Sequence, residues 1–401
     1  MKYFVLLGDG MADWPIEALN DQTPLEVAEK PLMDSLCGRG ICGRVMTVPE
    51  GMVPESDTAN LGVLGYDPKV YSKGRSPLEA ASIGLTMREC DVAFRVNILT
   101  VSDDNTPYDE KIMIDHSADE ITTEEADGLI RALQEAFGTR ERRFYTGVSY
   151  RHCMLWENPP QIPEFSRPHD ILGRPIKEYL PCEPYATLMR ESYKVLKNHP
   201  INENRRARGL KPANSAWFWS PGMRPSLPNF GEKYGLKGTI ISAVDLIRGI
   251  AKVAGMSAPI VDGATGTFHT DYRAKALAAI EAFQHGSDFV YVHVEAPDEC
   301  GHRAETENKI ASIEKLDSEI LTPVFEWLSN CGEDFKVLIL PDHPTPIQIR
   351  THAREAVPFV IYDSRTKRDN HVKRYTEKAV NEGGSVYLEE GPQLMDLFLE
   401  Q

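Results

Sequence analysis

Cysteine is scarce in this chain of 401 residues, and the seven that occur are scattered from Cys37 to Cys331. Their number is odd, and no two of them are spaced as C-x-x-C. This pattern argues against a disulfide framework, and it is typical of reduced thiols in a cytoplasmic protein. We therefore expect a cytoplasmic location.

Long hydrophobic runs are missing as well, and none approaches the roughly 20 residues needed to cross a bilayer. The apolar run at the N-terminus, Tyr3–Leu7, ends at Gly8 and Asp9 and is too short for the core of a signal peptide. Hydrophobic residues still make up 41% of the chain, enough for a large core. We expect a globular protein without a membrane partner.

Positive charge is in short supply, because 44 Lys and Arg face 60 Asp and Glu, giving a net charge of −16. Proteins that bind nucleic acids or anionic membranes need clustered cations, so we exclude both as partners. An anionic substrate would need locally placed Lys or Arg. The sequence carries no sign of the oligomeric state.

Short apolar runs alternate with amphipathic stretches, which indicates an α/β fold with a mostly parallel sheet flanked by helices. Helices are predicted over 271–283 and 305–328, with Pro323 kinking or splitting the second. The clearest predicted strands are Tyr3–Leu7, Thr239–Val244, Phe289–Val294, Val337–Leu340 and Pro358–Tyr362.

The alternation weakens in the middle of the chain, where prolines and aromatic residues gather. Strand-like pieces at 92–99 and 144–148 flank a predicted helix at 123–137. We predict a smaller α+β domain, residues 91–230, inserted into a discontinuous α/β domain of residues 1–90 and 231–401.

Acidic residues and histidines follow three of the predicted strands and precede a fourth. Ligands of open α/β sheets bind beyond the carboxyl ends of the strands, so we expect these side chains to converge at one edge. They are Asp9, Asp298, His302, Asp342, His343 and His352.

Carboxylates mixed with imidazoles favour Zn²⁺ or Mn²⁺ over Ca²⁺. Six ligands are too many for one tetrahedral ion, so two ions are the simplest arrangement. Asp298 and His302 are four residues apart and face the same way if that segment is helical. Crowded carboxylates also need cations if all of them are to stay ionised.

Ser56, in the sequence Pro-Glu-Ser-Asp-Thr, is the candidate nucleophile. It precedes the apolar residues 61–64, which predicts a helix N-terminus, a position suited to phosphate. A metal ion would lower the pKa of its hydroxyl and replace a general base. Taken alone, this serine would be an ordinary helix cap.

Ordered motifs along nearly the whole chain resemble the archaeal-type, cofactor-independent phosphoglycerate mutases of the alkaline phosphatase superfamily. The resemblance implies an alkaline-phosphatase-like sheet and interconversion of 2- and 3-phosphoglycerate in glycolysis. The motifs are LGDG at 7–10, TPLE at 23–26, SDTANL at 56–61, GYDP at 65–68, GRSPLEA at 74–80, FRVN at 94–97, GATG at 263–266, DECGH at 298–302 and DH at 342–343.

Carried onto this sequence, the resemblance implies two groups of ligands. One metal ion would be held by Asp298, His302 and His352. The other would be held by Asp9, Asp342 and His343, with Ser56 Oγ joining this second group. Members of the family use Mn²⁺, Zn²⁺ or Mg²⁺. A phosphoryl group stored on Ser56 makes a bisphosphoglycerate cofactor unnecessary.

The substrate side departs from the family pattern. Where mutases usually show Asp-Arg-Arg-Ala-Gly-Arg, this chain reads IDHSADE at 114–120. Glu55 replaces a usual Gly, and Asn60 stands where His is frequent. These differences resemble a bacterial branch proposed to phosphorylate homoserine with ATP in threonine biosynthesis. Homoserine kinase is therefore one alternative, and a phosphatase or a non-catalytic metal-binding phosphoprotein is another.

Arg95 stands out among the candidates for substrate binding, because it lies in an apolar strand-like run where an unpaired charge is costly. We expect the partner to be a small phosphorylated or hydroxylated metabolite. The full set of substrate candidates is Asn60, Arg75, Arg95, Asn97, His116, Arg151, His169 and Asp170.

Overall fold

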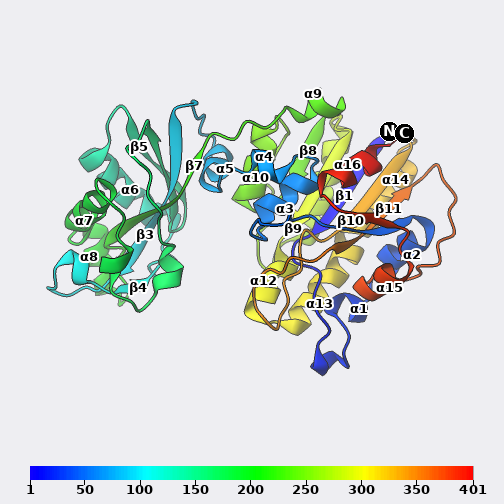
Figure 1. Cartoon of the computed structure of the whole chain (residues 1–401), viewed down its shortest axis with the longest axis horizontal. Helices are drawn as coiled ribbons and strands as arrows, with labels where there is room; N and C mark the ends of the chain where they lie inside the picture. The colour runs from blue at the N-terminus through cyan, green and yellow to red at the C-terminus, as the bar shows by residue number, and fades with distance from the viewer. Residues whose placement is uncertain (401) are drawn as a thin grey trace. The chain divides into compact units, whose positions relative to one another are not determined.

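The computed structural model describes residues 1–400, and the chain divides into two compact units (Figure 1). The first unit is Met1–Ser72 with Ser226–Gln401, and the second is Lys73–Pro225. The first boundary therefore lies earlier than the expected one, and residues 73–90 group with the inserted part of the chain.

Helix α5 (Ser76–Ser82) gives the reason for this difference. The Ser76 hydroxyl donates a hydrogen bond to the carbonyl of Ser220 at 2.5 Å, and Glu79 Oε2 lies 3.3 Å from Arg95 Nε. The helix thus packs on strands of the second unit. Its apolar pattern alone does not indicate which sheet it covers.

The first unit contains a seven-stranded sheet in the order β12-β2-β11-β10-β1-β9-β8. Strands β8, β9, β1 and β10 are parallel neighbours, whereas β11 runs antiparallel to both β10 and β2. The predicted α/β fold with a mostly parallel sheet is confirmed. The strands are β1 (Lys2–Gly8), β2 (Ile41–Val45), β8 (Gly238–Ile241), β9 (Phe289–Val294), β10 (Phe335–Leu340), β11 (Val357–Asp363) and β12 (Val386–Leu388).

Every residue of β1, β9 and β10 is buried, as expected for strands covered on both faces. Helices flank this sheet in Figure 1. They are α1 (Pro24–Val27), α2 (Pro31–Arg39), α3 (Ser56–Val63), α4 (Pro68–Tyr71), α9 (Phe230–Tyr234), α10 (Asp245–Val253), α11 (Tyr272–Gln284), α12 (Ala296–Arg303), α13 (Thr306–Lys315), α14 (Thr322–Asn330), α15 (Glu377–Gly383) and α16 (Pro392–Leu399), with one 3₁₀ turn at Glu17–Leu19.

The long helix predicted over 305–328 is interrupted, as Pro323 suggested. Between α13 and α14 lies a π-helical turn, Leu316–Leu321, and Pro323 occupies the first turn of α14. Proline lacks an N–H and clashes with the preceding turn, so the regular hydrogen-bond ladder cannot pass through it. The Thr322 hydroxyl donates to the carbonyl of Asp317 at 2.9 Å within this turn.

The second unit is built on an antiparallel sheet, in the order β4-β3-β6-β5, with β7 paired to β3. Its core includes the buried aromatic residues Trp217, Phe218 and Trp219. The strands are β3 (Asp91–Val101), β4 (Met113–Asp115), β5 (Arg142–Val148), β6 (Arg151–Glu157) and β7 (Ser215–Met223), and the further helices are α6 (Thr123–Phe137), α7 (Tyr185–Leu196) and α8 (Pro200–Ala207), with 3₁₀ turns at Tyr108–Glu110, Pro168–Ile171 and Ile176–Tyr179.

Across residues 1–400, each helix is too short or too polar to cross a membrane.

Candidate metal centre

The six predicted ligands meet at one edge of the seven-stranded sheet. Asp9 follows β1, Asp342 and His343 follow β10, and helix α12 brings Asp298 and His302 directly after β9. His352 precedes β11, and because β11 is antiparallel to β10, its start lies at the edge where β10 ends. A parallel β11 would have placed His352 at the opposite edge.

The ligand atoms form two overlapping groups. Those of Asp298, His343 and His352 lie within 4.8 Å of one another, and so do those of Asp9, Asp342 and His343. His302 Nε2 lies 3.0 Å from His352 Nε2 and 3.2 Å from Asp298 Oδ2. The structure thus brings all six residues together, with His343 within reach of both groups.

Backbone carbonyls orient two of the imidazoles. His302 Nδ1 lies 3.0 Å from the carbonyl oxygen of Arg350, and His352 Nδ1 lies 2.6 Å from that of Pro54. A carbonyl only accepts hydrogen bonds, so each Nδ1 carries a proton. In the neutral imidazole, Nε2 is then left as the ligand atom, an arrangement frequent in metal-binding histidines.

The buried carboxylates of the centre need nearby cations if they are to stay ionised. Burial, together with the neighbouring carboxylates Asp342, Asp298 and Glu295, raises the pKa of Asp9 well above its ordinary value. Asp9 Oδ1 is buried without a hydrogen-bond partner among residues 1–400. An orphaned carboxylate oxygen within a mixed oxygen and nitrogen set fits divalent cations.

The pKa of Asp298 shifts in the opposite direction from that of Asp9. Burial alone would raise its pKa, but the contacts with His302 and His352 hold the pKa well below the ordinary value. The same contact with Asp298 raises the pKa of His302 to about 9. In this geometry protonated imidazoles supply the positive charge that bound metal ions would bring.

Ser56 is the first residue of helix α3, as the sequence predicted. Its Oγ lies 3.4 Å from His343 Nε2, beside the second group of ligands. The preceding residue, Glu55, has extended backbone angles and serves as the N-cap of α3. Ser56 therefore stands at the N-terminal end of α3, the end at which helix N–H groups point outward.

Asn60, one turn further along α3, is completely buried. Its Nδ2 donates to the carbonyl of Ser56 at 2.8 Å and to Asp342 Oδ2 at 3.1 Å, and its Oδ1 accepts from the Tyr291 hydroxyl at 2.5 Å. These contacts tie the helix that carries Ser56 to a predicted metal ligand. They favour a positioning role over the substrate contact that we expected.

The sequence patterns did not identify three further buried residues of the centre, which are Thr345, Tyr291 and His293. His293 Nε2 lies 3.1 Å from Asp9 Oδ2, within hydrogen-bonding range, although the N–H is not aligned with the oxygen. A histidine inside an apolar strand is itself a signal, because a buried polar group needs a partner. Thr345 carried no comparable signal.

The remaining substrate candidates belong to the second unit. Arg95, in β3, is paired with Glu79, and its guanidinium lies 4.7 Å from the centre of the Trp219 ring. Burial lowers the pKa of Arg95, and the charges of Arg75 and Arg151 lower it further, while Glu79 opposes them. The structure therefore gathers three arginines in this part of the second unit.

A row of rings lies beside these arginines. The ring centres of His116 and His169 are 6.1 Å apart, and that of His169 is 5.5 Å from Trp219. Asp170 lies 3.7 Å from His169 Nε2. Asn97 donates to the carbonyl of His116 at 3.0 Å and accepts from Trp219 Nε1 at 2.9 Å, so its side chain serves the fold of the unit.

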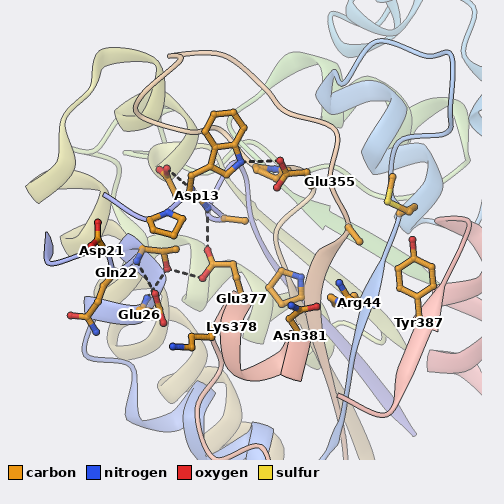
Figure 2. A pocket seen from close by; sticks show the side chains of 18 of the residues that line it. Asp13, Asp21, Gln22, Glu26, Arg44, Glu355, Glu377, Lys378, Asn381 and Tyr387 are labelled. Carbon is orange, nitrogen blue, oxygen red and sulfur yellow. Dashed lines mark hydrogen bonds between the residues drawn. The ribbon is translucent and has the colours of Figure 1, made fainter. Parts of the chain in front are cut away.

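A separate cavity of about 940 Å³ lies in the first unit (Figure 2). Its wall includes two cations, Arg44 and Lys378, and five carboxylates: Asp13, Asp21, Glu26, Glu355 and Glu377. None of the six predicted ligands lines it, although Pro344, the neighbour of His343, does.

Glu377, in the wall of this cavity, makes the stability of the folded chain depend on pH. Its carboxylate accepts hydrogen bonds from the Thr23 hydroxyl at 2.7 Å and from the Asp13 N–H at 3.1 Å (Figure 2). Burial nevertheless raises its pKa from 4.5 to about 7. The folded state thus binds this proton more tightly than the unfolded chain does. The bound proton stabilises the folded state by about 3 kcal/mol at pH values below 4.5, the pKa in the unfolded chain. This contribution is lost as the pH rises through 7.

We expect Glu377→Gln, which removes the charge, to be more stable than the wild type at about pH 8 and to lose this advantage at about pH 5. Urea unfolding at both pH values measures the difference. Glu382→Gln, at an exposed position of the same helix, is the control. Equal pH dependence of the Glu377→Gln variant and the wild type would contradict the assignment.

Comparisons with known proteins point to one family. A family model described as 2,3-bisphosphoglycerate-independent phosphoglycerate mutase matches residues 38–202. The chain is 46% identical to the 2,3-bisphosphoglycerate-independent phosphoglycerate mutase of Methanothrix thermoacetophila, with 100% of both chains covered.

Two solved structures are similar to this one. The PH0037 protein from Pyrococcus horikoshii is 28% identical, with a TM-score of 0.81 and coverage of 99% of this chain and 96% of that chain. The cofactor-independent phosphoglycerate mutase from Thermoplasma acidophilum is 25% identical, with a TM-score of 0.66 and coverage of 100% and 99%.

Proposed function

This chain belongs to the family of 2,3-bisphosphoglycerate-independent phosphoglycerate mutases, and we propose that it interconverts 2- and 3-phosphoglycerate through a phosphoserine at Ser56. The family resemblance drawn from the sequence motifs is confirmed. One observation carries the proposed chemistry: Ser56 Oγ stands at a helix N-terminus, 3.4 Å from His343 Nε2 and beside a set of six buried or half-buried ligands.

The proposed metal ligands are Asp298, His302 and His352 for one divalent cation and Asp9, Asp342 and His343 for the other, with Ser56 Oγ joining the second group. Mn²⁺, Zn²⁺ or Mg²⁺ would supply positive charge that lowers the pKa of the Ser56 hydroxyl and offsets the charge of the phosphate.

In the proposed reaction, Ser56 Oγ attacks the phosphorus atom of phosphoglycerate. A bond forms between Oγ and phosphorus, the bond to the glycerate oxygen breaks, and that oxygen takes up a proton. The N–H groups at the start of α3 face the transferred phosphoryl group. Attack by the other glycerate hydroxyl returns the phosphoryl group and frees Ser56, so no bisphosphoglycerate is needed.

The cationic residues of the second unit are our candidates for binding an anionic group of the substrate. Arg75, Arg95 and Arg151 can form charge-assisted hydrogen bonds with a carboxylate, and His116 and His169 add donors. Asp170 lies next to His169, and Asn97 holds the backbone of His116. Small cytoplasmic metabolites of this kind fit the expected cytoplasmic location.

Homoserine kinase activity is the second candidate, because of the segment 114–120. Asp115 Oδ2 and Asp119 Oδ1 lie 2.8 Å and 2.6 Å from Lys211 Nζ, so this segment forms an acidic turn around a single lysine. It offers no arginine to a phosphate, and homoserine, unlike phosphoglycerate, carries no phosphate of its own.

Two assays run side by side test the proposal. We expect turnover of 3-phosphoglycerate in an enolase-coupled assay without any nucleotide, and none with ATP and L-homoserine, because the phosphoryl group comes from the substrate itself. Turnover only in the second assay would overturn the mutase assignment. Fast hydrolysis of p-nitrophenyl phosphate without a transfer product would favour a phosphatase.

A further inference from the structure

We propose that Thr345 is a positioning residue that fixes the tautomer of His343 and the orientation of Asp298, and thereby sets the affinity of the centre for its metal ions. The inference rests on the proposed function, since it assumes that both residues are metal ligands. Thr345 is fully buried and lies two residues after His343 in the segment that follows β10.

The direction of the hydrogen bonds follows from the donors available. Thr345 Oγ1 lies 2.5 Å from Asp298 Oδ1, and an ionised carboxylate only accepts, so the hydroxyl proton points to Asp298. The same Oγ1 lies 3.4 Å from His343 Nδ1. With its single proton already donated, Oγ1 can only accept from His343, and Nδ1 must therefore carry the proton.

This tautomer leaves the lone pair of His343 on Nε2. Nε2 is the atom that faces the rest of the centre: it lies 3.4 Å from Asp342 Oδ2, 3.7 Å from Asp9 Oδ1 and 3.4 Å from Ser56 Oγ. One hydroxyl thus prepares His343, a proposed ligand of one cation, and orients Asp298, a proposed ligand of the other.

The backbone of Thr345 is also fixed by hydrogen bonds. Its carbonyl accepts from Lys309 Nζ at 2.8 Å, and its N–H donates to the carbonyl of Ala12 at 3.1 Å. Lys309 is neutralised by Asp13, 2.6 Å away, and both side chains are fully buried. The Asp13 N–H in turn donates to Glu377 at the wall of the cavity in Figure 2.

Two glycines let the neighbouring chain approach Thr345 closely. A Cβ on Gly10 would lie 2.5 Å from Thr345 Oγ1, and one on Gly301 would lie 2.6 Å from the Thr345 carbonyl oxygen. Gly10 also has a φ of 59°, in the left-handed region. A side chain on either glycine would therefore crowd Thr345, which is fully buried.

The test removes the hydroxyl and keeps the shape. In Thr345→Val, His343 Nδ1–H loses its acceptor, so the tautomer with the proton on Nε2 becomes populated. In that tautomer Nε2, the atom that faces the centre, has no lone pair for a metal ion. We expect Mn²⁺ to bind about 10- to 100-fold more weakly than to the wild type, the usual effect of removing a group that orients a ligand. Thr345→Ser keeps the hydroxyl and should bind Mn²⁺ nearly as the wild type does.

Calorimetric titration of the metal-free proteins with Mn²⁺ measures the dissociation constants, and the Mn²⁺ electron paramagnetic resonance spectrum reports the geometry of the bound ion. Thr239→Val is the matched control, because Thr239 is buried in β8 of the same unit and pairs its hydroxyl with Ser287 Oγ at 2.8 Å. Circular dichroism checks folding, and Thr345→Ala replaces the valine variant if that one does not fold.

Wild-type affinity in Thr345→Val would overturn the inference. So would an equal loss in Thr345→Ser and Thr345→Val, which would point to packing instead of the hydroxyl. Because the readout is metal binding, it is separate from the proposed activity. A wild type that binds Mn²⁺ but does not turn over phosphoglycerate would refute the mutase function and leave the role of Thr345 standing.

Discussion

Ser56→Ala is expected to abolish phosphoryl transfer, with kcat lowered by at least about 10⁴-fold, as is usual when a covalent nucleophile is removed. The Ser56 hydroxyl lies 3.4 Å from His343 Nε2, beside the proposed metal ligands. Metal content should stay nearly unchanged, because the six other ligands remain. Alanine is also well tolerated in the first turn of a helix.

The enolase-coupled assay measures the activity of this variant, and elemental analysis measures its metal content. Thr122→Ala, at the N-cap of α6 in the second unit, is a matched control that should keep full activity. Mass spectrometry of the wild type during turnover should find the phosphoryl group on the peptide that contains Ser56. Activity retained in Ser56→Ala would remove this residue from its role.

Asp9→Asn and Asp298→Asn form the second pair of strongly affected variants. Each replaces a charged ligand by a neutral amide, one in each group of ligands. We expect each variant to lose one of two bound ions and to lower kcat by about 10³-fold or more, because in the proposed mechanism both ions act on the same phosphoryl group.

Elemental analysis after dialysis against Mn²⁺ counts the ions per chain. Asp271→Asn is the control, because Asp271 is the N-cap of α11 and asparagine caps helices equally well. A wild type that holds a single ion, or variants that both retain two, would contradict the assignment of the ligands to two groups.

Much of the first unit could be predicted from its apolar runs. Phe289–Val294 was predicted with the bounds that the structure shows, and so was the helix Thr123–Phe137 of the second unit. The runs are readable because strands covered on both faces need continuous apolar sequence. Shorter edge strands such as Val386–Leu388, which is only partly buried, carry too little of this pattern.

The direction of β11 could not be predicted from the sequence. His352 was expected beside the other ligands on the assumption that all neighbouring strands are parallel. It does reach them, but because β11 is antiparallel and begins at that edge. Local sequence specifies that a strand forms and which residues it buries, while the connection around it decides its direction.

The supporting residues of the centre were the least predictable. Thr345 follows a proline and lies in no helix or strand, so no periodicity marks it. Asn60 was assigned to the substrate because it replaces a histidine of related enzymes, whereas in the fold it links Ser56 to Asp342. Such roles depend on contacts between segments far apart in the chain.

The position of β1 in the sheet has a consequence for biosynthesis. Among residues 1–400, β1 pairs with β9 and β10 alone, so this strand has no sheet neighbour until residues 289–340 have been translated. The intervening Lys73–Pro225 is continuous and can fold while the nascent chain still grows. The proposed set of six metal ligands is therefore incomplete until His352 has been translated, long after Asp9, which follows the first strand.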